Sequence, residues 1–307
     1  MRLEALHHIT MITADARDNV RFYADVVGLR LVKKTVNFDD PLSYHLYYGD
    51  ETGAPGSILT WFEAPGAPAG RAGAGMIHRI DLGVPSAAAL DFWAERLATH
   101  GVDAERTGDV LAFADPDGLA LALVVAGTNP PLVAHHPDVP AEHAITGLEA
   151  VRAYTAADPD AVDPVLTDLL GFAYAGAGAY DATGEERTFR LAFDAAPPAP
   201  GHSGAGTVHH IAWASRDEDH LGWQDRMARA GARVSPVMDR DYFRSIYFRV
   251  PVGLLFEIAT LSPGFAVDED PERLGEELRL PAMHQHLREH LERSLTPLAN
   301  PRSALAG

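Results

Sequence analysis

The sequence predicts an α+β fold in which four βαβββ modules form two tandem domains, followed by a helical C-terminal tail. Three observations lead to this prediction. A strand, an amphipathic helix and a glycine follow one another four times along the chain, and further strand-like runs come after each glycine. A proline-rich stretch then separates the first two copies from the last two.

The four copies have nearly the same length. They cover residues 9–28, 80–101, 151–171 and 211–231, and the glycine follows the start of the strand by 19, 21, 20 and 20 residues. Glycine just beyond a helix can adopt the left-handed conformation that ends it. Polar side chains are expected to cap the first turns of the four helices, namely Asp15, Ser86, Asp158 and Ser215.

The strand-like runs complete each module. In the first copy they are residues 29–32, 44–48 and 57–62, which are rich in apolar, aromatic and β-branched side chains. We therefore predict a glyoxalase-like arrangement with domain 1 at residues 1–127 (modules 1 and 2), a linker at 128–144, domain 2 at 145–265 (modules 3 and 4) and a helical tail at 266–307.

Composition narrows the classes of function. The 307 residues include 25 Lys and Arg against 43 Asp and Glu, so the net charge of −18 argues against nucleic acid as a partner. The absence of cysteine excludes thiol chemistry and iron–sulfur clusters, and leaves 15 histidines and the carboxylates as metal ligands. No apolar run is long enough to span a membrane, and the N-terminus has no apolar signal core, so we expect a cytoplasmic protein.

Two modules begin with the same pair of histidines. Alignment of the copies places His8 and His210 at equivalent positions. Alignment of the last strands on their leading glycines makes Thr60, Ala122 and Glu257 equivalent, and only Glu257 is a carboxylate. Two imidazoles and one carboxylate are the ligand set of non-haem Fe(II) oxygenases with open coordination positions.

The predicted strands also indicate which neighbours share the site. Residues two apart on a strand face the same side, so Thr10 should accompany His8, whereas His7 and His209 should lie nearby without binding the metal. Glu257 lies in the apolar run 253–259, where an unpaired carboxylate would cost several kcal/mol. A bound cation would remove that cost.

The chain resembles the vicinal oxygen chelate superfamily, which includes glyoxalases, bleomycin resistance proteins and extradiol dioxygenases. Within it, the sequence is similar to ring-cleaving dioxygenases related to hydroquinone 1,2-dioxygenases. The resemblance rests on the sequence motifs LHHIT (6–10), LVKKTVN (31–37), DDP (39–41), YHLYYGD (44–50), VHHIA (208–212) and DRDYFRSIYF (239–248). They span nearly the whole chain.

The resemblance implies a site and a reaction. It places the metal ligands on His8, His210 and Glu257, with Fe(II) as the expected metal and Mn(II) as an alternative. The surrounding positions that it implies are His7, Thr10, His209, Arg240 and Tyr247. The expected activity is extradiol-type ring cleavage, in which O2 is inserted into a hydroquinone or a catechol.

The surrounding side chains have separate expected roles. Tyr247 and His209 would orient a substrate oxygen and move protons, and Arg240 would hold an anionic group or stabilise developing negative charge. Two alternatives stay open. One is a glyoxalase-like isomerase or transferase, which would usually need a fourth ligand where Thr60 stands, and the other is a non-catalytic small-molecule-binding protein. The expected partners are a small aromatic diol and O2, and homo-oligomerisation is left open.

A metalloprotease-like sequence motif near the C-terminus has a simpler explanation. Residues 286–290 read His-Leu-Arg-Glu-His, which fits the H-x-x-E-H pattern. Only 17 residues follow it, so little chain remains for a third ligand. We instead expect a docking face formed by Met283, Leu287, Leu291 and Leu295.

Overall fold

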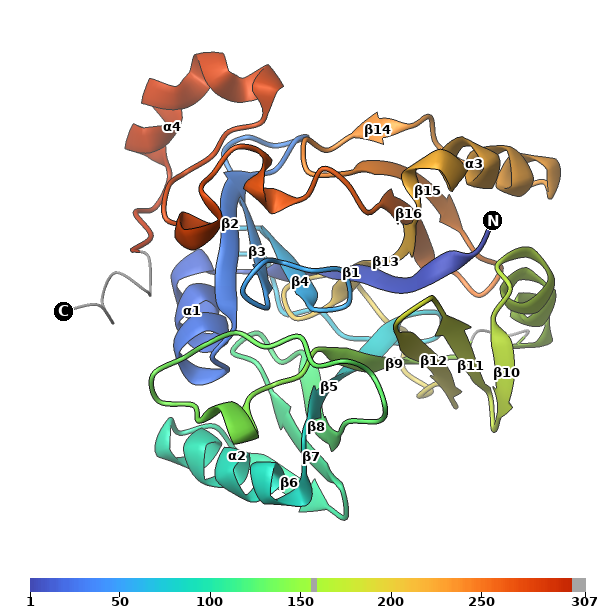
Figure 1. Ribbon diagram of the computed structural model, residues 1–307, viewed down its shortest axis with the longest axis horizontal. Coiled ribbons are helices and arrows are strands. Elements are labelled where there is room, and N and C mark those ends of the chain that lie inside the picture. The colour runs from blue at the N-terminus through green and yellow to red at the C-terminus, as the bar shows by residue number, and fades with distance from the viewer. Residues whose placement is uncertain (156–158, 300–307) are drawn as a thin grey trace.

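A computed structural model describes residues 1–155 and 159–299, and it contains the four predicted βαβββ modules (Figure 1). Module 1 consists of β1 (Leu3–Thr13), α1 (Ala16–Val20), the π-helix η1 (Arg21–Val26), β2 (Arg30–Val36), β3 (Tyr44–Gly49) and β4 (Ile58–Glu63). Module 2 consists of β5 (Ile77–Val84), α2 (Ala87–Thr99), β6 (Ala104–Thr107), β7 (Val110–Ala114) and β8 (Ala120–Val125).

The second half repeats the pattern of the first half. The linker carries the 3-10 turn η2 (Ala141–His143). Module 3 consists of β9 (Leu148–Tyr154), η3 (Pro159–Val162), the π-helix η4 (Val165–Leu169), β10 (Ala173–Gly176), β11 (Ala179–Thr183) and β12 (Thr188–Asp194). Module 4 consists of β13 (Val208–Ser215), η5 (Asp217–Asp219), α3 (His220–Arg229), β14 (Met238–Asp239), β15 (Arg244–Arg249) and β16 (Leu255–Thr260).

The predicted helix ends are confirmed, and the predicted starts are confirmed only in part. Gly28, Gly101, Gly171 and Gly231 all have positive φ, between 72° and 85°. Asp15 caps α1 through the backbone N–H groups of Arg17 and Asp18, and Ser86 caps α2. The prediction for Ser215 is wrong, because β13 continues through this residue and the turn η5 precedes α3. Asp158 lies outside the described residues.

The modules combine across the chain into two eight-stranded sheets. One sheet has the order β14-β15-β16-β13-β1-β4-β3-β2, so it joins module 4 to module 1. The other has the order β10-β11-β12-β9-β5-β8-β7-β6 and joins module 3 to module 2. In Figure 1 the blue and orange strands accordingly lie together, as do the two sets of green strands. Each sheet therefore contains one module from each predicted domain. The boundary between the two domains at the linker, residues 128–144, remains a prediction.

The seam between modules 1 and 4 is the antiparallel pair β1 and β13. Ile9 lies opposite Ile211, and on either side of this pair His8 faces Ala212 and Thr10 faces His210. Ile9 and Ile211 are completely buried, as are Trp61 and Trp213 in the same apolar core. The packed core therefore fixes the register that positions the two histidines. Among the described helices, none has the length and apolarity needed to cross a membrane.

Within the described residues, the tail predicted at residues 266–307 is helical over part of its length. It contains the 3-10 turns η6 (Phe265–Val267), η7 (Pro271–Arg273) and η8 (Ala282–Leu287) and one α-helix, α4 (Arg288–Ser294). Pro271 and Pro281 interrupt any longer helix. Between them Gly275 packs so closely on β2 that an added Cβ would lie 2.1 Å from the carbonyl oxygen of Leu31.

The tail also covers the free edge of β2. Leu278 forms an isolated parallel bridge with Lys34, and the backbone N–H of Arg279 donates to the carbonyl of Lys34. Leu291 and Leu295 are buried as the predicted docking face requires, whereas Met283 is 59% exposed and does not belong to it.

Candidate metal centre

Strand register places the three predicted ligands on one face of one sheet. His8 on β1 lies opposite Ala212 on β13, and Ala212 lies beside Glu257 on β16. His210 is two residues before Ala212 and therefore points to the same face. The three side chains thus come from three adjacent strands, although more than 200 residues separate His8 from Glu257.

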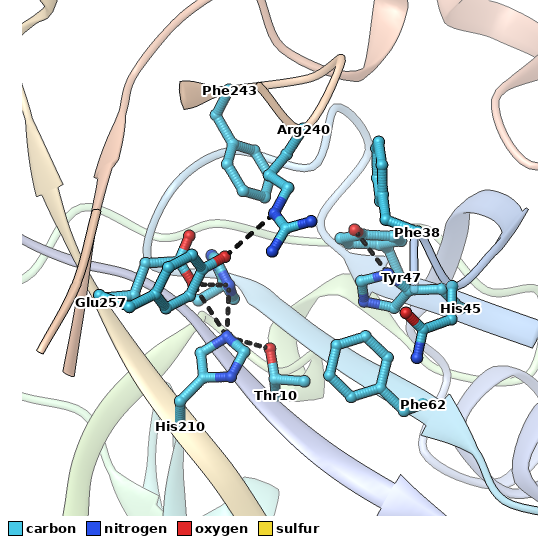
Figure 2. A pocket seen from close by; sticks show the side chains of 12 residues that line it. Thr10, Phe38, His45, Tyr47, Phe62, His210, Arg240, Phe243 and Glu257 are labelled. Carbon is cyan, nitrogen blue, oxygen red and sulfur yellow. Dashed lines mark hydrogen bonds and ion pairs between the residues drawn. The ribbon is translucent and has the colours of Figure 1, made fainter. Parts of the chain in front are cut away.

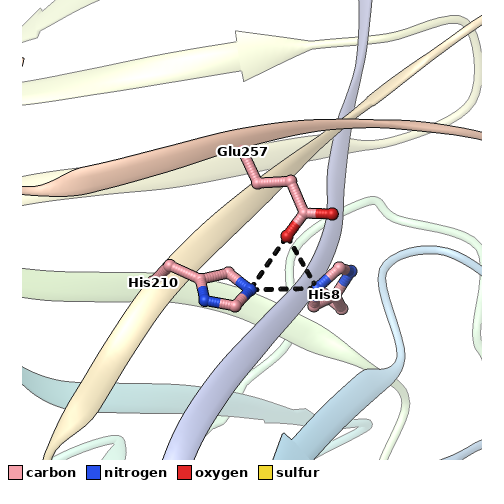
Figure 3. A group of neighbouring side chains, drawn as sticks. All are labelled: His8, His210 and Glu257. Atoms are coloured by element: carbon pink, nitrogen blue, oxygen red, sulfur yellow. Dashed lines mark hydrogen bonds and ion pairs between the residues drawn. The ribbon is translucent and has the colours of Figure 1, made fainter. Parts of the chain in front are cut away.

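The three side chains form a compact group (Figure 3). Glu257 Oε2 lies 2.9 Å from His210 Nε2 and 3.4 Å from His8 Nε2, and the two Nε2 atoms are 3.4 Å apart. Each side chain offers one ligand atom, and these atoms all lie within 4.8 Å of one another. Within residues 1–155 and 159–299, no other group of three or more such side chains meets this criterion.

The chemistry of these donors fits a bound cation. Glu257 is completely buried, and its Oε1 accepts a hydrogen bond from the hydroxyl of Ser245. Its Oε2 has no hydrogen-bond donor of acceptable geometry among the described residues. Burial works to raise the pKa of Glu257, but the neighbouring His8 and His210 hold it well below its usual range. An ionised carboxylate oxygen with an unused lone pair, facing two imidazole nitrogens, is a suitable ligand set for Fe(II).

The other two histidines support the ligands from behind. His7 Nδ1 lies 2.8 Å from His8 Nδ1, and His209 Nδ1 lies 2.8 Å from His210 Nδ1. The imidazole of His7 also hydrogen bonds to the backbone of Thr260, which raises its pKa, whereas burial and His8 lower that pKa to about 3 overall. A ligand whose Nδ1 is engaged in this way keeps the lone pair of Nε2 for the metal.

A pocket opens in front of the group. Its empty space, including open solvent at the mouth, is about 330 Å³, and it is lined by His8, Thr10, Asn37, Phe38, His45, Tyr47, Phe62, His210, Arg240, Phe243, Tyr247 and Glu257. Of the surrounding residues predicted from the sequence, Thr10, Arg240 and Tyr247 line it. His7 and His209 do not, and His209 faces a separate hollow behind His210.

Thr10 and Arg240 contribute polar groups to the pocket (Figure 2). The hydroxyl of Thr10 lies 2.8 Å from His210 Nε2. The Nε of Arg240 donates to the hydroxyl of Tyr247 at 3.3 Å, and its guanidinium carbon lies 5.2 Å from the centre of the Phe38 ring. In the part of the chain that the structure describes, Arg240 forms no ion pair with a carboxylate. A cation without a protein anion is available to an anionic ligand group.

The aromatic side of the pocket was not predicted. His45 and Tyr47 of β3 line the wall opposite Glu257 and His210, together with Phe38 and other aromatic side chains (Figure 2). The residues lie in the YHLYYGD word, whose alternation indicated a strand, but alternation alone does not show which face meets a ligand. Their role depends on the register of β3 with β4, which places Tyr47 opposite Thr60.

Comparison with known proteins agrees with this geometry. The sequence family model of the Glyoxalase/Bleomycin resistance protein/Dioxygenase superfamily matches residues 5–123 and 147–258, so the chain belongs to this superfamily. A Bacillus subtilis protein named "Putative ring-cleaving dioxygenase MhqO" is 41% identical, over 95% of this chain and 96% of its own length. The chlorohydroquinone/hydroquinone 1,2-dioxygenase of Sphingobium indicum is 31% identical, over 96% of each chain. The crystal structure of a Bacillus subtilis protein described as a "putative dioxygenase" superposes with a TM-score of 0.88, at 39% identity over 97% of this chain and 98% of that chain.

Proposed function

We propose that this protein is an Fe(II)-dependent ring-cleaving dioxygenase that acts on a hydroquinone- or catechol-type aromatic diol, with cleavage of the extradiol type. The observation that carries the proposal is the buried group of His8, His210 and Glu257, which opens directly into an aromatic-lined pocket. Relatives named as ring-cleaving dioxygenases over almost the full chain support the same reaction. Mn(II) is the alternative metal for this ligand set.

His8, His210 and Glu257 would hold the metal through one nitrogen each from the histidines and one carboxylate oxygen. Fe(II) bound there would supply a shared binding point and an electron path for the diol and O2, and would make a bound hydroxyl more acidic. His7 and His209 would keep both imidazoles in the tautomer that presents Nε2. His209 lies outside the pocket, so this positioning role fits it better than the direct contact with substrate oxygen expected from the sequence.

Tyr247 and Arg240 would handle charge on the substrate side. Burial raises the pKa of the Tyr247 hydroxyl, and the nearby Glu257 raises it further, so this tyrosine stays protonated and can donate a hydrogen bond. Arg240 holds the hydroxyl of Tyr247 in place and would stabilise negative charge that develops on substrate oxygens. Thr10 would donate or accept a hydrogen bond next to His210.

The alternative functions have less support from the site. An isomerase or transferase of the glyoxalase type would usually need a fourth ligand at Thr60, but the Thr60 hydroxyl is engaged by His45 Nε2 at 2.5 Å. A non-catalytic binding protein has no need of two imidazoles around a buried carboxylate. The first alternative therefore lacks its fourth ligand, and the second leaves the three candidate ligand side chains unexplained.

The test is anaerobic reconstitution of the metal-free protein with Fe(II), followed by O2 admission with a panel of hydroquinones and catechols. We expect O2 uptake together with a ring-opened acid identified by mass spectrometry. Mn(II) in a parallel arm distinguishes the two metals. Absence of uptake with the whole panel, combined with metal binding that is unaffected by Glu257→Ala, would overturn the proposal.

A further inference from the structure

His45 and Tyr47, on the pocket wall opposite the candidate metal centre, form a hydrogen-bonded chain with Thr60. Thr60 Oγ1 lies 2.5 Å from His45 Nε2, and His45 Nδ1 lies 3.0 Å from the hydroxyl oxygen of Tyr47. All three side chains are buried, with exposed fractions of 0%, 7% and 1%. Both ring nitrogens of His45 are therefore engaged, so the two hydrogen bonds must run in the same direction along the chain.

A neutral imidazole has one N–H donor and one acceptor nitrogen, so the chain has two orientations. If Tyr47 donates to Nδ1, then Nε2–H donates to Thr60, and the Thr60 proton is left without an acceptor among the described residues. If Thr60 donates to Nε2, then Nδ1–H donates to Tyr47, and the unmet proton lies where a pocket ligand can accept it, because Tyr47 lines the pocket and Thr60 does not. The second orientation leaves the Tyr47 proton pointing to a group outside the chain.

The Tyr47 hydroxyl has no other protein partner to receive that proton in the described part of the chain. It lines the pocket, where an unmet buried hydroxyl costs about 1–3 kcal/mol. Burial also raises the pKa of Tyr47 well above its usual value, so that the hydroxyl remains a donor across the physiological range. A ligand oxygen at this end of the pocket would complete the chain.

The position of Tyr47 indicates which ligand oxygen this is. Figure 2 shows Tyr47, His45 and Phe38 grouped on one side of the pocket, and Glu257 and His210 on the other, with Arg240 reaching between them. A catechol places both of its adjacent oxygens at one end of the ring. Only an aromatic ring with a second oxygen at its far end can contact both walls at once.

We propose that Tyr47, oriented by His45 and Thr60, donates a hydrogen bond to a second ring oxygen para to the one that faces His8, His210 and Glu257, and thereby selects hydroquinone-type ligands over catechols and simple phenols. This specificity role rests on the proposed function, because it takes the ligand to be an aromatic diol held at the metal centre. Tyr47 contacts the ligand, whereas His45 and Thr60 act as positioning residues.

Equilibrium binding tests the role separately from turnover. Fe(II)-loaded protein is titrated without O2 with hydroquinone, phenol and catechol, and calorimetry measures the affinities. We expect the unmodified protein to bind hydroquinone about tenfold more tightly than phenol, as one neutral hydrogen bond in a buried site provides. Tyr47→Phe should remove this difference by weakening hydroquinone alone, with phenol unchanged within about twofold.

Two further variants control the comparison. Tyr48→Phe removes a buried hydroxyl from the next residue of β3, which hydrogen bonds to Asn19 rather than facing the pocket, and should keep the preference for hydroquinone. Thr60→Val removes the donor that orients His45, and should reduce the preference without abolishing it. Circular dichroism confirms that each variant is folded.

The outcomes separate the two proposals. Equal affinities for hydroquinone and phenol in the unmodified protein, or an unchanged preference in Tyr47→Phe, would overturn the role of Tyr47 whatever the turnover. The unmodified-protein comparison needs no variant, so a misfolded Tyr47→Phe does not block the test. A clear preference that disappears in Tyr47→Phe, without O2 uptake by the unmodified protein, would support the Tyr47 contact and reject the dioxygenase reaction.

Discussion

Thr60 and Glu257 occupy equivalent positions in the two halves of one sheet. Two rows of paired residues cross the sheet. The row through Thr60 is Tyr47, Thr60, Thr10 and, across the seam, His210. The row through Glu257 is Tyr247, Glu257, Ala212 and, across the seam, His8. The site is therefore nearly two-fold symmetric in its tyrosines and histidines and asymmetric in its carboxylate. Glu257 makes one half the candidate metal centre, and in the other half the Thr60 hydroxyl hydrogen bonds to His45.

This asymmetry predicts that substitution of Glu257 lowers metal affinity and that the equivalent substitution of Thr60 does not. Glu257→Ala removes one of three ligands, so Fe(II) affinity should fall by at least about 100-fold, which exceeds the usual loss for an outer contact. Thr60→Ala, the equivalent change in module 1, should leave the affinity within about twofold. Anaerobic titration with metal analysis of the dialysed protein measures both. Equal affinities for the two variants would contradict the assignment of Glu257.

His209 should affect the metal without affecting the substrate. It contacts His210 Nδ1 from outside the pocket, so His209→Ala should lower metal affinity by about 10- to 100-fold while KM at saturating metal stays unchanged. His202→Ala is the control, since this histidine is exposed and its imidazole hydrogen bonds to the backbone carbonyl of Ala69, away from the candidate metal centre. A His209→Ala variant with normal metal affinity but little turnover would instead support the proton-transfer role expected from the sequence.

Lys33 should hold the C-terminal tail in place. Its ammonium is completely buried and pairs with Asp268 and Glu269, of which Glu269 is also buried. Lys33→Met would leave the buried Glu269 carboxylate with only Arg279, 3.6 Å from its Oε1, so the free energy of unfolding should fall by about 3 kcal/mol, the lower end for a broken buried pair. Denaturant unfolding measures this loss, and hydrogen exchange should increase first in residues 268–298.

A compensating change provides the control for Lys33. Adding Glu269→Gln to Lys33→Met removes the unpaired charge, so the double variant should recover part of the lost stability. If the single variant is as stable as the unmodified protein, the ion pair does not secure the tail.

Asp115 should make stability depend on pH between about 4 and 6. Burial raises the pKa of Asp115 to about 6, although it accepts hydrogen bonds from Leu119 N and the Tyr23 hydroxyl. In this window the folded state binds more protons than the unfolded state, whose carboxyl has its ordinary pKa of about 3.9. The contribution of Asp115 to the free energy of unfolding is therefore fully present below pH 4, and about 3 kcal/mol of it is lost as the pH rises through 6.

Thermal or denaturant unfolding at several pH values checks this slope. Asp115→Asn should flatten the contribution between pH 4 and 6, because the amide does not titrate. Asp103→Asn, at an exposed position, should keep the slope of the unmodified protein. A slope that is the same in Asp115→Asn would assign the pH dependence to other groups.

The sequence alone determined the repeating modules and singled out the candidate metal ligands, which the structure brings together. Modules are local: a strand, a capped helix and a glycine with positive φ depend on neighbouring residues, as Gly28 and Ser86 show. The ligands were also readable, because repetition of the histidine pair and of the last strand made His8, His210 and Glu257 stand out from other polar residues. Local sequence signals were less reliable at Ser215, where the predicted helix cap is instead the last residue of strand β13.

Only the tertiary structure decided how these parts meet. The pairing of β1 with β13 joins modules at opposite ends of the chain, and no local pattern states which strand edges will hydrogen bond. The same holds for Tyr47 and His45, which face the pocket because of the register of β3 with β4, and for the tail, whose course depends on a buried lysine more than 230 residues away. Residue types and spacing therefore identified the ligands, whereas long-range strand pairing and burial determined the pocket around them.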